Sequence, residues 1–89
     1  MTKKIAVLVR DRKHEALRMA VGATLMNDVV HVFVMDEKLE IDEETETNLQ
    51  MLEDLKARVF SNNPENELEQ KTTEEIAAML ADYDVVIPY

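Results

Sequence analysis

The sequence predicts an α/β protein built on a parallel β-sheet. Short apolar runs rich in β-branched residues alternate with segments of helical periodicity along the chain, and this alternation is typical of parallel strands joined by crossover helices. The apolar runs are hydrophobic at consecutive positions, as strands buried on both faces are. With 89 residues, of which 46% are hydrophobic, the chain makes one domain. We therefore expect a single β-α-β-α-β-α-β domain over residues 1–89.

The first half of the chain should contain two strands and the helix between them. Residues 4–9 (KIAVLV) are apolar on both faces and form the first strand. Helical periodicity follows over residues 13–26, and Asn27-Asp28 is expected to end this helix, because asparagine tolerates the left-handed cap conformation. Residues 29–35 (VVHVFVM) are the clearest strand in the sequence.

The second half should repeat the alternation twice. Over residues 43–57, leucines recur at steps of three and four with acidic residues opposite, which predicts an amphipathic helix. Residues 58–61 (RVFS) form a short third strand, and the polar segment after them is a loop. The sequence TTEE that opens residues 72–83 is a capping box, so a third helix starts there. Residues 84–89 (DVVIPY) are the last strand.

Composition excludes several kinds of site. The chain has no cysteine, so disulfides, thiolate nucleophiles and cysteine-based metal centres are excluded. Its only glycine is Gly22, inside the first helix, so the glycine-rich loops that cradle dinucleotides and nucleoside triphosphates are absent. The two histidines, His14 and His31, lie too far apart in the expected fold to bind a metal together. We expect no metal, no cofactor, no membrane segment, and a cytoplasmic location.

Charge is distributed unevenly along the chain. Residues 1–27 carry six basic and two acidic residues, a net charge of +4, whereas the whole chain has a net charge of -9. The remaining two thirds would repel a phosphate backbone, so we do not expect nucleic acid as a partner. The uneven distribution of charge is better suited to steering or orienting a binding partner as it approaches.

Three segments taken in order resemble the DsrE/DsrF-like family: KKIAVLV, EALRMAVGATLMND and VVHVFVMD. The resemblance covers residues 3–36 best and is architectural only after residue 72. It implies a three-layer, flavodoxin-like fold with four strands in the order 2-1-3-4, and a homo-oligomer or a hetero-oligomer of related subunits. Several family members carry sulfur as a cysteine persulfide in relay complexes. This chain has Ser61-Asn62-Asn63-Pro64 after its third strand and no cysteine, so the relay chemistry does not transfer to it.

The expected strand order places a candidate binding site at the carboxyl ends of the first and third strands. In such a sheet the strand order reverses between these two strands, and ligands bind in the crevice there. A small anion or an acidic partner would meet cations and helix N–H groups. The alternative interpretation is that these side chains are ordinary solvated residues of the protein surface. The candidate residues are Arg10, Arg12, Lys13, His14, Ser61, Asn62 and Asn63.

The first helix is apolar in almost every direction, which is typical of a helix buried on all sides. We expect another subunit to cover its outer face, with Arg18 in an intersubunit salt bridge. The alternative is that small alanines simply lie exposed. The residues expected at this interface are Leu17, Arg18, Val21 and Leu25.

No nucleophile can be placed beside His14, so we expect a non-catalytic protein rather than an enzyme. The function predicted from the sequence is that of a DsrE-like oligomeric binding or assembly protein, associated with sulfur metabolism but unable to carry a persulfide. The alternative is a binding protein or an enzyme that takes a small anion or nucleotide at the basic loop after the first strand.

Overall fold

In a computed structural model that describes residues 3–25, 29–36, 38–66 and 68–88, the chain forms a parallel sheet with helices on both faces. The predicted alternation of strands and helices is confirmed. The strands are β1 (Lys4–Val9), β2 (Val29–Val34), β3 (Arg58–Ser61), β4 (Glu69–Gln70) and β5 (Val85–Pro88). The helices are α1 (Lys13–Leu25), α2 (Glu43–Asp54) and α3 (Thr73–Leu80).

The number and order of the strands differ from the prediction. The described residues form five strands in the order β4-β3-β2-β1-β5, not four in the order 2-1-3-4. The four predicted strands therefore lie in the order 3-2-1-4, the other common arrangement of doubly wound sheets. The chain steps outward from β1 to β2 to β3 and then returns to the far side of β1, where β5 pairs with it.

The additional strand, β4, lies within the segment expected to be a loop. It consists of Glu69 and Gln70, which pair in parallel with Phe60 and Ser61 at the edge of the sheet. Two polar residues, both exposed, carry neither the length nor the apolar run from which a strand is predicted.

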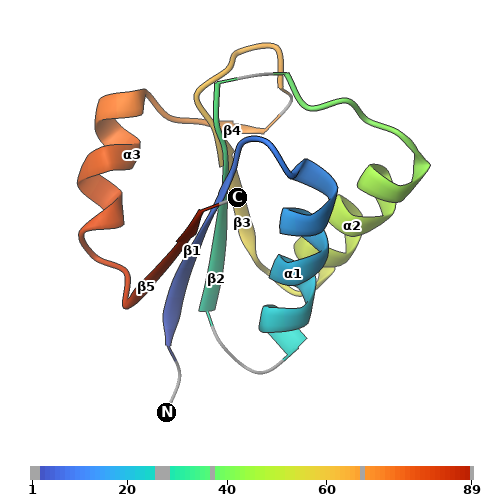
Figure 1. Ribbon diagram of the computed structural model, residues 1–89, viewed down its shortest axis with the longest axis horizontal. Helices are drawn as coiled ribbons and strands as arrows, with labels where there is room; N and C mark the ends of the chain where they lie inside the picture. Colours follow the sequence, from blue (N-terminus) through green and yellow to red (C-terminus); the bar gives the residue numbers. More distant parts are fainter. Residues whose placement is uncertain (1–2, 26–28, 37, 67, 89) are drawn as a thin grey trace.

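The sheet separates two hydrophobic clusters. In Figure 1 the sheet is seen near its edge, with α1 and α2 on one face and α3 on the other. Alternate residues of each strand face opposite clusters. The cluster beneath α1 and α2 includes Val7, Val32 and Leu52, and the cluster beneath α3 includes Phe33, Phe60 and Ile76. Right-handed crossovers explain this division, because the return from β3 to β5 reverses the direction of winding and places α3 on the opposite face.

Local hydrogen bonds determine where the second and third helices begin and end. Asp42 accepts a hydrogen bond from the Thr45 backbone N–H at 2.8 Å and caps α2. The predicted capping box of α3 is confirmed, because Thr72 and Glu75 each accept from the other's backbone N–H. The second helix ends at Asp54, before the predicted residue 57, because Lys56 turns left-handed with φ 64°. The predicted end of α1, Asn27-Asp28, lies outside the described residues.

Candidate functional site

The observed strand order separates the two halves of the site predicted from the sequence. The strand beside β1 at the reversal of strand order is β5, whereas β3 lies on the far side of β2. The strands that carry the two loops are therefore not neighbours, but Arg10 and Asn62 still meet at Asp36, which follows β2. Arg10 Nε lies 4.0 Å from one Asp36 carboxylate oxygen, and the Asn62 amide donates to the other at 3.1 Å. The expectation that the first and third strands are neighbours is wrong, because β2 inserts between them.

Cations of the basic loop face carboxylates of the same chain. Arg10 Nε lies 4.0 Å from an Asp36 oxygen, and Arg12 lies 3.8 Å from Glu15. These pairs are largely solvent-exposed, so each adds little to stability. They nonetheless supply local counter-charges to the two arginines that were expected to bind an anion.

The next two residues, Lys13 and His14, lie at the start of α1. His14 Nε2 is 3.5 Å from the Asp42 carboxylate, and its Nδ1 is 3.4 Å from the Thr45 hydroxyl. The Thr45 backbone N–H, with a smaller contribution from His14, holds the pKa of Asp42 below its usual value. A polar hollow of about 320 Å³ lies here, lined by Asp11, Lys13, His14, Lys38, Leu39 and Glu40. Its mixed charges do not select an anion.

Asn62 and Asn63 hold the loop that follows β2. The Asn62 side chain accepts from the Asp36 backbone N–H at 2.6 Å and donates to the Asp36 carboxylate at 3.1 Å. It also donates to the Thr73 hydroxyl at 3.0 Å. The Asn63 amide donates to the Asp36 carbonyl at 3.0 Å. These bonds position Asp36, whose φ is 67°, so both asparagines have a structural role in the described chain.

Ser61 belongs to a buried polar cluster below this loop. Its hydroxyl oxygen accepts from the Asn63 N–H at 3.0 Å and from the Asn66 amide at 2.9 Å. The Asn66 carbonyl oxygen accepts from the Leu39 N–H at 2.7 Å. Ser61 is fully buried and Asn66 is 6% exposed, so the cluster ties the β2–α2 loop to the β3–β4 loop.

The residues expected at a subunit interface have different positions. Leu17 and Val21 lie in the chain's own core, against the sheet and α2, so their side chains are not available to another subunit. Arg18 makes its salt bridge with Glu44 of α2 in the same chain. Leu25 is 63% exposed, and the Arg18 side chain is also exposed, so these two residues keep the exposure of interface residues. The first helix is apolar on several sides because it packs on both the sheet and α2.

A second group of polar residues lies at the opposite end of the sheet, on the α3 face. His31 of β2 shares a hydrogen bond with the Tyr83 hydroxyl. The Lys4 ammonium lies 4.8 Å from the centre of the Tyr83 ring. Partial burial, with the positive charges of Lys4 and Arg58, lowers the pKa of His31 below 6.5. Burial also raises the pKa of Tyr83. His31, Tyr83 and Lys4 thus contact one another within the chain, and we assign them a structural role.

The lowered pKa of His31 predicts that the fold becomes less stable as the pH falls through 6.5. Below pH 6.5 the unfolded chain binds a proton that the folded chain resists, so the free energy of unfolding falls as the pH falls through 6.5. We expect the urea midpoint to be lower at pH 5.5 than at pH 7.5, and His31→Gln to flatten this dependence. Asp42, Glu69 and Glu75 have pKa values lowered from 3.8 or 4.5, so their contributions are lost at lower pH. An equal pH dependence in the variant would contradict the assignment to His31.

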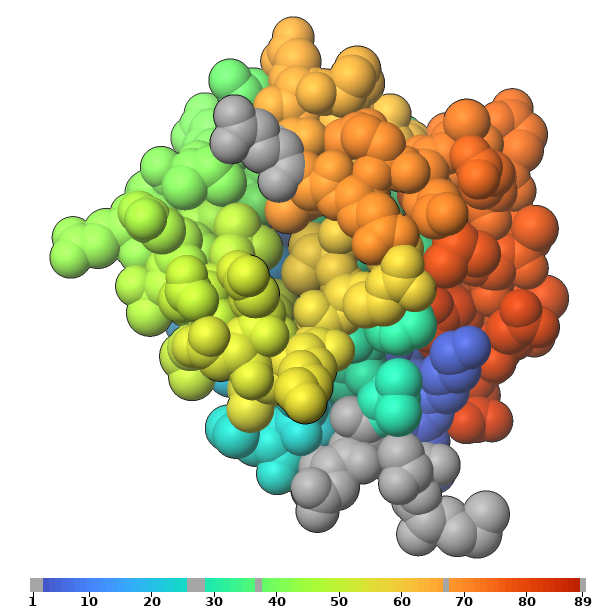
Figure 2. Space-filling view, turned by 180° about the vertical axis from the view of Figure 1, so that it is seen from behind, coloured from blue at the N-terminus to red at the C-terminus, as the bar shows by residue number. Residues whose placement is uncertain are grey.

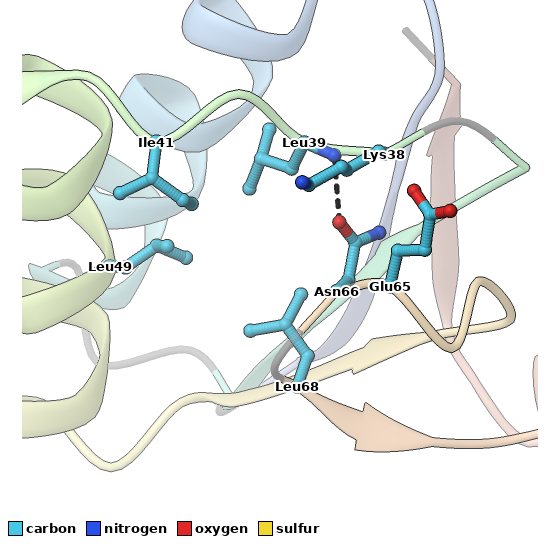
Figure 3. A pocket seen from close by; sticks show the side chains of 7 residues that line it. All are labelled: Lys38, Leu39, Ile41, Leu49, Glu65, Asn66 and Leu68. Carbon is cyan, nitrogen blue, oxygen red and sulfur yellow. Dashed lines mark hydrogen bonds between the residues drawn. The ribbon is translucent and has the colours of Figure 1, made fainter.

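The sequence analysis missed a groove beside α2. It consists of two neighbouring hollows, of about 490 and 340 Å³, that share Ile41, Leu49 and Leu68. Figure 2 shows the surface hollowed between α2 and the segment that carries β3 and β4. In Figure 3, Ile41 and Leu49 face Leu68 across the first hollow, and Leu39 lies at its inner end, where its N–H is bonded to Asn66. We call this feature the α2 groove. It is lined by Lys38, Leu39, Ile41, Glu46, Leu49, Gln50, Glu53, Ala57, Val59, Glu65, Asn66, Leu68 and Glu69.

The topology explains why the groove is open. The crossover helices α1 and α2 lie on one face, but the next helix, α3, lies on the other. No described helix therefore covers β4 on the face occupied by α2. The sequence contains one indication of this surface: Ile41 and Leu68 are isolated apolar residues in otherwise polar, acidic segments.

Comparisons with protein-family models, curated proteins and solved structures find no match for this chain. Among the described residues, no group of three or more histidine or acidic side chains is arranged to hold a metal ion. The helices in this part of the chain are also too short or too polar to span a membrane.

Proposed function

We propose that this protein is a non-catalytic binding protein that assembles with other protein chains, as the DsrE-like resemblance implies, and that it does not carry a persulfide. The observation that carries the proposal is the α2 groove. Its floor is largely apolar, its rim is charged, and no histidine, serine or threonine lines it among the described residues. An apolar trough with a polar rim has the composition of a protein-binding surface.

The resemblance supports this proposal only in part. The three layers agree with a flavodoxin-like fold, but the strand order is not the 2-1-3-4 that the resemblance implies. Binding of a small anion or nucleotide at the basic loop has weaker support. Arg10, Arg12 and His14 each face a carboxylate of the chain. Asn62 and Asn63 are hydrogen-bonded to Asp36, the residue that also faces Arg10.

Self-assembly, the form of association that the resemblance implies, is tested by size-exclusion chromatography with light scattering at micromolar concentration; binding in the α2 groove is tested separately below. The expected result is a mass that is a multiple of the 10.3 kDa chain. The surface of the isolated chain favours this result because it exposes large apolar side chains: Leu25 is 63% exposed and Val29 is 44% exposed. A constant mass of one chain over the whole concentration range would remove self-assembly from the proposal, and association would then require a different protein.

A further inference from the structure

The charge on the rim of the α2 groove is strongly negative. Glu46 and Glu53 project from α2, and Glu65 and Glu69 lie on the opposite side, with Lys38 as the one basic residue in the described lining. Glu69 forms a salt bridge with Arg58. The other three glutamates have no ion pair among the described residues. A partner that approaches this rim is favoured by positive charge, because opposite potentials steer association and like charges oppose it.

The floor of the groove offers apolar contact that the chain itself leaves open. Ile41 is 59% exposed, and Leu49 and Leu68 are only partly buried although they pack against the core. Burying such side chains yields roughly 25 cal/mol for each Å² of apolar area removed from water. A partner must therefore present an apolar face between its positive charges.

The shape of the groove suits a helix. The residues that α2 contributes to the wall are Glu46, Leu49, Gln50 and Glu53, which form one stripe over two turns. A helix laid along this stripe would become a third helix on the same face of the sheet, covering β3 and β4. Helices that pack side by side lie about 8–10 Å apart, and this position beside α2 is the one that the topology leaves vacant.

We propose that the α2 groove binds an amphipathic helix of a partner protein, with apolar residues at helical spacing and lysine or arginine on both flanks. The inference rests on the proposed function, since it names the partner of a protein-binding surface. A second copy of this chain is a poor occupant. Its own exposed helices, α2 and α3, begin with acidic first turns, and acidic rims repel each other. Self-assembly therefore uses another surface.

The test uses three synthetic peptides of about four helical turns. The first has a leucine face flanked by lysine and arginine, the second has the same face flanked by glutamate, and the third is a scrambled form of the first. We expect the basic amphipathic peptide to bind saturably, the acidic one to bind roughly tenfold or more weakly, and the affinity of the basic one to fall with added salt. Absence of saturable binding, or equal binding of the acidic peptide, would overturn the proposal.

Two variants and two controls locate the binding surface. Glu53→Lys combined with Glu65→Lys reverses the rim charge, and it should not weaken α2, because Glu53 lies near the helix C-terminus, where a cation is favoured. Its control, Glu74→Lys together with Asp82→Lys, makes the same change of charge at two exposed positions at the ends of α3. Ile41→Ser removes apolar surface from the groove. Its control is Met51→Ser, because helical geometry places Met51 on the side of α2 opposite the wall, where it is 39% exposed.

We expect each groove variant to weaken binding of the basic peptide about tenfold, and each control to leave it within about twofold, with circular dichroism confirming that all four remain folded. Nuclear magnetic resonance should place the perturbed amides in α2 and near Leu68. Equal losses in the controls would overturn the assignment to the groove. Binding by a protein that scattering shows to be a monomer would support this inference while rejecting self-assembly.

Discussion

Leu52→Ala is expected to lower the free energy of unfolding by about 3 kcal/mol, the largest effect of any single substitution in α2. Leu52 is fully buried and belongs to the cluster that joins α2 to the sheet. Thr45 is the only other buried residue of α2. Leu52 is therefore the one fully buried apolar side chain with which this helix packs on the core. The loss is measured as a shift of the urea midpoint at constant slope.

The adjacent residue provides the control for this substitution. Met51 is 39% exposed, and Met51→Ala should change the free energy of unfolding by less than about 0.5 kcal/mol. Both substitutions place alanine in the same helix, so helix propensity does not separate them. Similar losses in the two variants would contradict the packing of α2 described above.

Asn66→Ala is expected to cost about 2–3 kcal/mol, because it breaks a buried polar bridge. The Leu39 N–H lies in a residue that is 2% exposed and would lose its side-chain acceptor, and the Ser61 hydroxyl would lose a donor. Two loops depend on this one amide, so they should also become more mobile. The measurement is again urea denaturation, followed by amide exchange at Leu39.

Asn48 offers a control of the same residue type. It lies in α2, is partly exposed, and its side chain makes no hydrogen bond among the described residues. Asn48→Ala should therefore be neutral or slightly stabilising, since alanine favours a helix. If both asparagine variants lost the same stability, the bridge would not be the cause of the loss at Asn66.

The elements that could be predicted from the sequence are those with a strong local pattern. The first strand and the start of α3 follow from an apolar run and from the capping box of Thr72 and Glu75, which act within a few residues. The strand order has no such local origin. It depends on which side of β1 the last strand pairs with, a contact between residues far apart in the sequence. The two-residue strand β4 forms only because β3 is already beside it.

The candidate site was harder to predict than the fold. Arg10 and Asn62 belong to one sequence-predicted site because the assumed strand order makes their strands neighbours. In the observed order β2 lies between these strands, and the two side chains meet only through Asp36, a residue that the sequence does not single out. Leu17 indicated a subunit interface because the sequence does not reveal that α2 packs against α1. The α2 groove depends on the face that each crossover helix occupies, so isolated residues such as Ile41 acquire a role only when the layers are known.

The unequal covering of the two faces has a consequence for local opening. On one face of the sheet, α1 and α2 pack against each other. On the other face, α3 is the only described helix, and Ile76 is its only buried residue. Detaching this short helix would uncover the stacked Phe33 and Phe60 rings, whose centres lie 5.1 Å apart, and leave the other cluster intact. We therefore expect α3 to open locally while α1 and α2 stay packed on the sheet, so that α3 exchanges its amide hydrogens well before β1 and β2 do.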